Sequence, residues 1–398
     1  RRLVEIKRVE AAADILFEVN RHDEAVNICI ENRKYDKAKA LAQGNPTLRR
    51  RVDEAYQGEL VSRGETNELV GLGHSEVALD VLAKKGDWER LWEVAGQEHM
   101  SATVVGKYVI MRVEELMHKN SSADLDEAVK TINKRNGPAT EAAVGTYRRL
   151  VMRLLSRTSK EETEEHAATI STLRDILYRL ANQYRSQPID KKLNAEILEM
   201  LMAVHYQNML YSAKTMGLKE IAAKCSITLL KYPKFIPHDK AFYQAGMACR
   251  EQGNTNLSFL LLNRFVDLTE AIDANDASFL DNTEFQEADA IPTLNEILPE
   301  RHYLDNEDDR EDVRTWVLSV VTDSHIEQRL PPRESSRNTL YEGLYQSDRP
   351  TCIVTGYQIH PADMLEVNNS TANRRDWNAY VVKTRACPWT GQAQNPLY

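Results

Sequence analysis

Apolar residues recur every three or four positions through most of the first 272 residues of this 398-residue chain. That spacing places them along one face of an α-helix, with polar residues on the other face. Ile170, Leu173 and Leu177 illustrate the pattern, and a later stretch of the same kind ends shortly before Pro233. Glycines and capping residues separate the stretches, which predicts short helices paired in hairpins. We therefore expect residues 1–272 to form a mainly α-helical array.

Three short segments indicate that the helices repeat. Residues 23–26, 75–78 and 126–129 have similar sequences and begin 52 and 51 positions apart. Each is expected to open a helix, because an acidic or hydroxyl residue stands where it can cap the free backbone N–H groups. An aromatic residue, Tyr35 or Trp88, then opens the next helix in the first two units. The pattern predicts repeated pairs of helical hairpins, with chance similarity in a helix-rich sequence as the alternative.

The later part of the array carries two further signals. Ser159 and Glu162 have the spacing of a capping box, which predicts a helix start at that point. Residues 238–271 resemble a degenerate tetratricopeptide repeat, with small, turn and aromatic residues at the expected packing positions. Those positions are Phe242, Gly246, Gly253, Ser258, Leu262 and Phe265. Such repeats stack to bury their apolar faces, so the resemblance implies a tetratricopeptide-like solenoid with a concave surface for partner proteins.

The chain changes character near residue 290. Eight of its 13 prolines lie beyond that point, and proline is unfavourable in helix interiors. Residues 273–312 contain 14 Asp and Glu against 2 Arg, a net charge of −12, with isolated apolar residues such as Phe285 and Ile291. This stretch is either a solvated acidic linker or a tether whose apolar residues dock on the array. Residues 313–345 are predicted to form connecting helices, the first of them over residues 313–322.

The last fifty residues contain two near-copies of one short sequence. Residues 352–356 read Cys-Ile-Val-Thr-Gly, and residues 387–391 read Cys-Pro-Trp-Thr-Gly. Between them we predict a small β-hairpin, followed by an amphipathic helix over residues 374–384 whose aromatic face is buried.

A closed zinc site is not expected between these two segments. Such a site needs four Cys or His ligands, and Cys352, Cys387 and His360 supply three at most. The chain has five cysteines, an odd number that does not suggest a disulfide framework. We therefore predict neither a metal nor a cofactor.

The order of loop, hairpin, helix and loop resembles the U-box fold of ubiquitin ligases, so we assign residues 346–398 to a small α+β U-box-like domain. In that family, residues of both loops contact the ubiquitin-conjugating enzyme. The resemblance implies this role for Ile353, Val354, Pro388 and Trp389. It assigns the structure of the loops to Cys352, Thr355, Cys387 and Thr390. One departure from the family pattern is Ile353, which stands where U-boxes usually carry proline.

U-box ligases position a charged conjugating enzyme and do little chemistry themselves, so no catalytic residue is predicted. Two possibilities remain for the domain. It is either an active ubiquitin ligase, with the conjugating enzyme and ubiquitin as partners, or a former U-box kept as a docking module.

Four segments of the chain, taken together, resemble those of a known family. They are residues 314–318, 327–331, 352–357 and 372–378. As a set they are similar to the carboxy-terminal portion of the large subunits of intraflagellar transport complex B, as expected for a chain that begins with Arg1. The resemblance implies a scaffold in the trains that carry cargo along axonemal microtubules and support cilium assembly. It further implies other complex B subunits and complex A subunits as partners, in the cilium or flagellum and basal body, with a cytoplasmic pool.

The bulk properties exclude some other classes of protein. The net charge is −9 and no basic face is evident, which argues against nucleic-acid binding. No apolar run reaches the roughly 18 residues of a membrane span. A membrane-coat protein with similar repeats is an alternative, but no basic amphipathic helix supports it. The preferred function is therefore a protein-interaction scaffold, with a scaffold that is also a ubiquitin ligase as the alternative.

Overall fold

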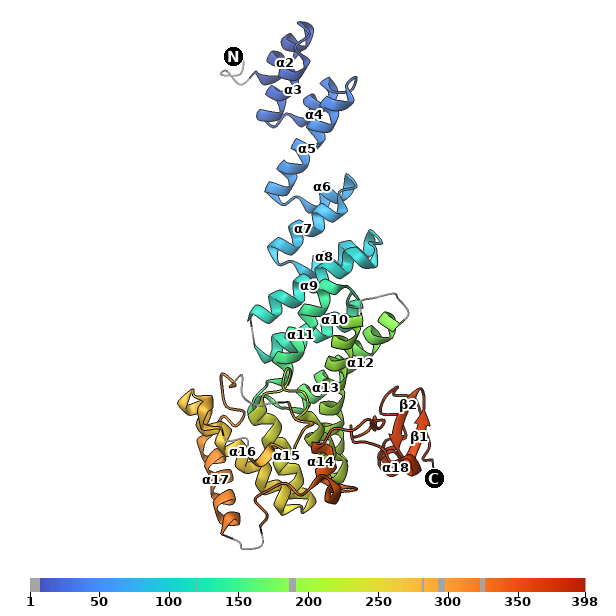
Figure 1. The fold of residues 1–398 in the computed structure, drawn as a ribbon. Helices are drawn as coiled ribbons and strands as arrows, with labels where there is room; N and C mark the ends of the chain where they lie inside the picture. Colours follow the sequence, from blue (N-terminus) through green and yellow to red (C-terminus); the bar gives the residue numbers. More distant parts are fainter. Residues whose placement is uncertain are drawn as a thin grey trace. The chain divides into compact units, whose positions relative to one another are not determined.

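A computed structural model describes residues 8–119, 121–185, 191–280, 283–292, 298–322 and 326–397. Within these ranges most of the chain is helical, and a small two-stranded sheet lies near the carboxy-terminal end (Figure 1). The predicted class, a mainly α helical-repeat fold followed by a small α+β end, is confirmed. The chain divides into two compact units, residues 1–112 and 113–398.

The first unit is a run of short helices in which each packs against the next along the chain. They are α2 (Val9–Glu18), α3 (His22–Glu31), α4 (Tyr35–Leu41), α5 (Pro46–Arg63), α6 (Thr66–Gly71), α7 (Ser75–Lys85) and α8 (Trp88–Gln97). The next helix, α9 (Ala102–Lys119), extends beyond the boundary between the units.

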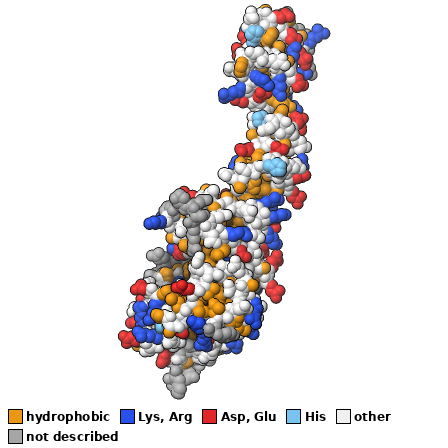
Figure 2. Space-filling view, turned by 90° about the vertical axis from the view of Figure 1, so that its right-hand side faces the viewer, with side chains coloured by type: hydrophobic (Ala, Val, Ile, Leu, Met, Phe, Trp, Pro, Cys, Tyr) orange, Lys and Arg blue, Asp and Glu red, His pale blue; other side chains and the backbone are white. Residues whose placement is uncertain are grey.

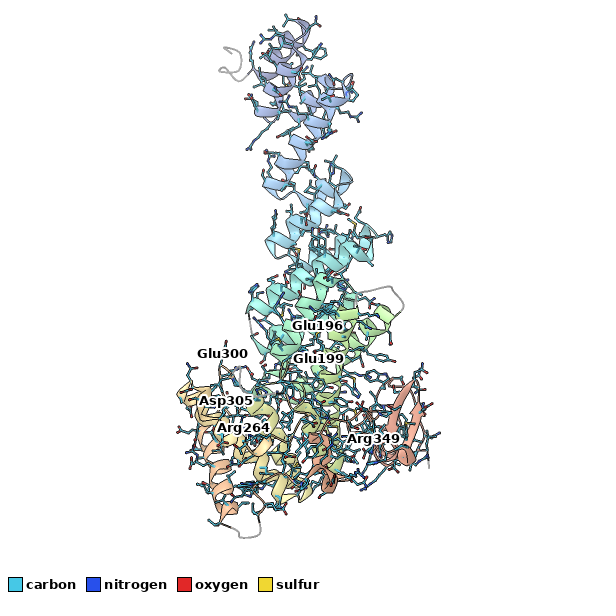
Figure 3. All side chains as sticks on the ribbon, in the orientation of Figure 1. Glu196, Glu199, Arg264, Glu300, Asp305 and Arg349 are labelled. Carbon is cyan, nitrogen blue, oxygen red and sulfur yellow. The ribbon has the colours of Figure 1, made fainter. Side chains whose placement is uncertain are left out.

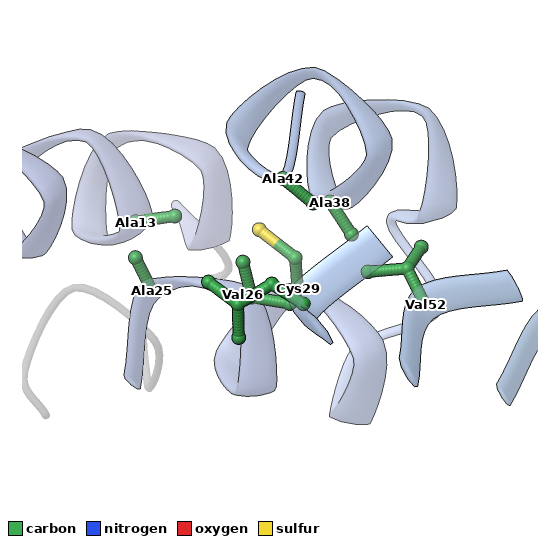
Figure 4. Close-up of a cluster of buried hydrophobic side chains, with 8 residues drawn as sticks. Ala13, Ala25, Val26, Cys29, Ala38, Ala42 and Val52 are labelled. Atoms are coloured by element: carbon green, nitrogen blue, oxygen red, sulfur yellow. The ribbon is translucent and has the colours of Figure 1, made fainter. Parts of the chain in front are cut away.

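Small side chains form much of the core of the first unit. Ala13, Ala25, Val26, Cys29 and Ala38 are all fully buried in one cluster (Figure 4). Small residues at a helix contact let the backbones approach closely, which suits helices of only about two to three turns. The repeated segments lie where the sequence predicted them, in the first turns of α3 and α7, and Tyr35 and Trp88 begin α4 and α8.

The third repeated segment does not open a helix, contrary to the prediction. Residues 126–129 lie inside α10 (Ser122–Arg135), because the Ser121 hydroxyl caps that helix earlier by accepting the Asp124 N–H at 3.1 Å. Asp126 is buried instead of capping, and its carboxylate pairs with the Arg157 guanidinium at 3.0 Å. The similarity to the first two segments therefore does not extend to their structural role.

The second unit continues with longer helices, and from α12 to α17 each contacts the next. They are α11 (Glu141–Leu155), α12 (Glu164–Arg185), α13 (Lys191–Thr215), α14 (Lys219–Leu229), α15 (His238–Gln252), α16 (Thr255–Ala274) and α17 (Glu307–Val321). Short 3₁₀ turns are η1 (Ser159–Glu161), η2 (Ala277–Phe279), η3 (Thr283–Phe285), η4 (Arg333–Ser336), η5 (Leu340–Leu344) and η6 (Pro361–Asp363).

The capping box before α12 lies one residue earlier than predicted. Thr158 and Glu161 form it, and the Glu161 carboxylate accepts the Thr158 N–H at 2.9 Å. The register moves because Glu162 is drawn into the interior, where its carboxylate pairs with the ammonium group of Lys240 at 2.6 Å. The box closes the turn η1, and α12 begins only at Glu164.

Helices α15 and α16 form the predicted tetratricopeptide-like hairpin. Gly253 makes the turn between them with φ of 87°, a left-handed conformation that favours glycine. A Cβ atom at Gly246 would lie 2.6 Å from the Leu262 side chain, and the Ser258 hydroxyl donates to the Gly246 carbonyl at 2.9 Å. The small residue at position 246 is therefore what allows the two helices to pack.

Helix α17 begins six residues before the predicted start at 313. The Asn306 side chain caps it by accepting the Asp308 N–H at 3.2 Å, and three acidic residues follow in the first turn, where the helix dipole favours negative charge. Arg314 pairs with Glu270 of α16, and Arg250 of α15 stacks over the Trp316 ring at 4.8 Å. Packing of α17 thus extends the array by one more helix.

The carboxy-terminal end contains the predicted hairpin and helix. Strands β1 (Met364–Val367) and β2 (Ser370–Asn373) pair antiparallel, with Met364 opposite Asn373 and Val367 opposite Ser370. Helix α18 (Arg374–Thr384) follows directly. Within the described ranges, no helix combines the length and apolar character needed to cross a bilayer.

We expect Gly246→Val to lower the free energy of unfolding of the second unit by about 1–3 kcal/mol, because the added methyl groups overlap the Leu262 side chain. The matched control is Gly145→Ala in α11, where a Cβ atom meets only the end of the Arg149 side chain at 4.0 Å. That control should be neutral or stabilising by up to about 1 kcal/mol, since alanine favours helix. Chemical denaturation followed by circular dichroism measures both. Equal effects of the two substitutions would contradict the close packing of α15 on α16.

Candidate protein-interaction site

The two near-copied segments adopt the same backbone structure. In the first loop (residues 352–356), the Gly356 N–H donates to the Cys352 carbonyl at 2.7 Å, and in the second loop (residues 387–391) the Gly391 N–H donates to Cys387 at 2.9 Å. Both glycines have φ above 70°, which favours glycine. Equivalent isolated bridges, Thr351 with Gln358 and Ala386 with Ala393, close each loop. The internal similarity of the sequence is thus also a similarity of structure.

The predicted loop residues make local hydrogen bonds. The Cys352 sulfur accepts the Asn373 N–H at 3.2 Å, and the Cys387 sulfur accepts the Thr390 N–H at 3.4 Å. The Thr355 hydroxyl donates to the buried Asp376 carboxylate at 3.2 Å. Among the residues that the structure describes, no three His, Cys, Asp or Glu side chains gather as a metal site would require. In these loops backbone and side-chain hydrogen bonds hold the turns.

Helix α18 follows the hairpin and contacts the first loop through its first turn. Its first turn is capped by the Asn373 side chain, which accepts the Arg375 N–H at 3.0 Å and the Asp376 N–H at 3.3 Å. Trp377 and Val381 are 1% and 0% exposed, so the helix has the buried aromatic face that its periodicity predicted. The Ile353 N–H donates to Thr371 of β2 at 2.9 Å, which ties the first loop to the hairpin.

The first loop is docked on the helical array through its backbone carbonyls. Four consecutive carbonyls, of residues 352 to 355, each accept a hydrogen bond from an array side chain. The donors are Tyr206 Oη at 3.4 Å, His205 Nε2 at 2.7 Å, Cys225 Sγ at 3.3 Å and Thr228 Oγ1 at 2.7 Å, in the order of the carbonyls. These donors come from α13 and α14. A buried carbonyl without a partner costs about 1–3 kcal/mol, so the donors to the carbonyls of residues 353 to 355 permit this loop to be buried, while the Cys352 carbonyl also accepts the Gly356 N–H within the loop.

The second loop is held through Trp389. Its indole ring lies edge-on to the rings of Tyr178 and His205, with centroids 5.2 and 5.0 Å away, and the Arg174 guanidinium lies 5.1 Å from its centroid. Arg174 also donates to the Trp389 carbonyl. His205 therefore contacts both loops, by a hydrogen bond to Ile353 and by ring packing to Trp389. Guanidinium stacking on a desolvated indole is among the stronger cation–π arrangements.

A partly buried ion pair completes the contact. The Lys224 ammonium lies 2.8 Å from the Asp376 carboxylate of α18 and 3.0 Å from Glu220, and Arg375 lies 2.6 Å from Glu220. Burial opposes the charged form of Lys224, but the attraction of Asp376 and Glu220 outweighs it and raises the pKa of Lys224 above its usual value. The ion pair therefore persists at neutral pH.

All four residues that the U-box resemblance assigned to a conjugating enzyme lie in this docked region. Ile353, Val354 and Trp389 are 7%, 0% and 8% exposed, and Pro388 is buried too. The array residues that cover them, such as His205 and Thr228, were not singled out from the sequence. The one sign of these residues in the sequence is that a polar residue stands within an apolar helical segment. That sign does not identify the distant loop to which the residue hydrogen-bonds.

Comparison with known proteins gives one consistent result, although no protein-family model matches the chain. The protein named intraflagellar transport protein 172 homolog is 31% identical over 393 residues in Danio rerio and over 397 residues in Homo sapiens. Intraflagellar transport protein 172 of Chlamydomonas reinhardtii is 30% identical over 416 residues. These matches cover 96%, 97% and 100% of this chain, but it spans only 22% to 23% of the length of each relative. That coverage is consistent with a carboxy-terminal portion of such a protein.

We expect the second unit to lose stability as the pH falls below about 6.5. Burial, together with the charge of Arg174, lowers the pKa of His205 to about 3, so between pH 6.5 and about 3 the unfolded chain binds a proton that the folded chain does not. His205→Gln keeps a donor for the Ile353 carbonyl but does not titrate. Its unfolding midpoint should therefore depend less on pH in this window than that of the wild type, measured by denaturant titrations from pH 7 to 4. Exposed His118 supplies the control His118→Gln. If both variants keep the wild-type slope, His205 is not buried as a neutral group.

Proposed function

Because the chain is homologous along nearly its whole length to proteins named intraflagellar transport protein 172, we propose that it is a protein-interaction scaffold of intraflagellar transport trains. In that role it supports cilium assembly and the transport of cargo along axonemal microtubules. Its partners are other complex B subunits and complex A subunits. It resides in the cilium or flagellum and at the basal body, with a cytoplasmic pool. The relatives' name supports the transport role, and the helical array supports the scaffold role, because stacked helical repeats offer long surfaces to partners.

The observation that carries the scaffold proposal is the docked first loop. Four of its carbonyls are paired with donors of α13 and α14, and Val354 is fully buried. A surface that recruits a conjugating enzyme has to be exposed. With these residues buried, the module of residues 346–398 serves best as a structural element that closes one side of the array.

The surface of the array is suited to specific contacts with proteins. On the face that Figure 2 shows, acidic and basic side chains are interspersed within each unit, with apolar side chains between them. Interspersed charge gives specificity and register more than general affinity for polyanions. This distribution supports protein partners over nucleic acid.

A second candidate function is that of a ubiquitin ligase that acts after the module is released. The matched turns of the two loops favour it, because they place Ile353 and Pro388 in equivalent positions of similar turns, and likewise Val354 and Trp389. Release would have to break the Lys224–Asp376 pair and leave the Thr355 carbonyl without Thr228. This candidate therefore requires an opening step that the scaffold function does not.

The scaffold proposal predicts that the fluorescently tagged chain enters cilia and moves along them in both directions at the speeds of a tagged complex B subunit. Affinity purification from the same cells should recover complex B and complex A subunits well above a tag-only control. Imaging in living cells and mass spectrometry are the two measurements. Exclusion from cilia together with absence of all such subunits would contradict the proposal.

The docked module predicts that the purified chain does not speed the discharge of ubiquitin from a panel of charged conjugating enzymes. Thr228→Arg places a large side chain against Gly356, where even a Cβ atom would overlap Thr228, so it should push the first loop off α14. Exposed Thr215→Arg in α13 is the matched control for the added charge. Faster ubiquitin discharge with the Thr228→Arg chain, but not with the wild type or the control, would favour the second candidate. Discharge by the wild-type chain would contradict a purely structural role.

A further inference from the structure

Tyr303, a residue of the acidic stretch, is held by the array through both its backbone and its side chain. The Tyr303 backbone N–H donates to Asp239 Oδ2 at 2.7 Å, and its carbonyl accepts the Ser159 N–H at 2.9 Å. Its hydroxyl donates to Glu162 Oε2 at 2.6 Å. The side chain is 7% exposed. Both backbone groups and the end of the side chain are therefore recognised by separate groups of the array.

Helix α15 supplies most of the wall around the ring. The Tyr243 ring lies 5.5 Å from the Tyr303 ring between centroids, and Lys240 Nζ lies 5.4 Å from the Tyr303 centroid. These contacts enclose an aromatic side chain and leave its hydroxyl facing a carboxylate. The pocket thus matches a tyrosine in both shape and hydrogen bonding.

The carboxylate is positioned independently of Tyr303. Glu162 also accepts the Tyr211 hydroxyl at 2.6 Å and pairs with Lys240, which in turn donates to the Arg157 carbonyl at 3.1 Å. Burial opposes ionisation of Glu162, but Lys240 and the hydrogen bonds to it lower its pKa below the usual value. Lys240 and Tyr211 still contact this carboxylate when Tyr303 leaves, so the acceptor for the tyrosine hydroxyl keeps its position.

The residues on either side of Tyr303 also contact the array. Arg301 pairs with Glu161 at 3.0 Å, and His302 Nε2 lies 2.8 Å from the Asp273 carboxylate of α16. Leu304 is 3% exposed. Figure 3 shows Glu300 and Asp305, which flank this segment, on the side of the second unit where α16 lies. The array thus binds a sequence of arginine, histidine, tyrosine and an aliphatic residue in an irregular, bent form.

We propose that the contact surface formed by Ser159, Glu162 and helix α15 is a binding site for a partner peptide with an unphosphorylated tyrosine, and that residues 300–305 occupy it in cis. The partner sequence has an aliphatic residue after the tyrosine and basic residues before it. A phosphate on the tyrosine would bring at least one negative charge against Glu162, so phosphorylation prevents binding. Phenylalanine leaves a buried carboxylate oxygen without one of its donors, which weakens binding.

Residues 300–305 of the same chain occupy the site and so limit its access to other peptides. A tethered segment has an effective concentration on the order of millimolar, so a free peptide competes poorly until the segment is displaced. The site refines the scaffold function by defining one class of partner. Its measurement needs only the purified chain, so a failure here leaves the transport function untouched.

The test uses a labelled peptide with the sequence of residues 300–306, Glu-Arg-His-Tyr-Leu-Asp-Asn. In the full chain, Tyr303→Ala removes the ring and hydroxyl of the cis segment and leaves only its backbone and neighbouring contacts, and fluorescence anisotropy should show saturable binding that is at least tenfold tighter than to the wild type. Peptides with phosphotyrosine or phenylalanine at the tyrosine position should bind at least tenfold more weakly. Adding Glu162→Gln should weaken binding to a similar extent, whereas the exposed control Glu164→Gln should leave it unchanged.

Two results would overturn the proposal. One is that the folded Tyr303→Ala chain binds none of the peptides; the other is that it binds the phosphorylated and unphosphorylated forms equally. If that variant does not fold, the wild-type chain still gives an answer. An excess of the unlabelled tyrosine peptide should accelerate hydrogen exchange at residues 301–305 but not in α15. Unchanged exchange at those residues would likewise exclude competition for the pocket.

Discussion

The row of hydrogen bonds from α13 and α14 to four consecutive carbonyls of the first loop determines how the carboxy-terminal end is held. A tight loop cannot pair all of its own carbonyls, and burying them without donors would cost several kcal/mol in total. Tyr206, His205, Cys225 and Thr228 supply those donors. The first loop is joined to the hairpin through Ile353 and Thr371 and to α18 through Thr355 and Asp376, while Trp389 holds the second loop on the array. The same contact covers Ile353 and Val354, two of the four residues that the U-box resemblance assigned to a conjugating enzyme.

The acidic stretch illustrates the same principle at a second place. Its net charge would suggest a solvated linker, yet Phe285, Tyr303 and Leu304 are buried on the second unit. A buried Lys240–Glu162 pair is an expensive way to stabilise a fold, because both charges lose their hydration. That pair is better explained by recognition, since it presents a fixed carboxylate to the tyrosine hydroxyl. Specific polar donors and acceptors, more than apolar area, thus decide which segments the array accepts.

Local features of the sequence predicted much of this structure. The three- to four-residue period, the glycine at position 253 and the near-copied loops indicated the helices, the α15–α16 hairpin and the paired turns. In two of the places where prediction failed, an inward-facing polar residue was involved: Asp126 binds Arg157 instead of capping, and Glu162 turns inward and moves the capping box by one residue. The docking contacts join residues 127 to 148 positions apart in the sequence. No local pattern encodes such pairings, so the sequence drew attention to the two loops but could not predict that they are buried.

The central claim is that the array and the carboxy-terminal module are packed together in the free protein. The most direct measurement is the rate at which a thiol reagent modifies Cys225, which belongs to α14 but is buried beneath the first loop and donates to Val354. With mass spectrometry resolving each cysteine, we predict that Cys225 and Cys352 react slowly and at the same rate, because both become accessible only when the unit opens. Rapid modification of Cys225 in a chain whose helices remain folded would show that the module is detached, and would contradict this account.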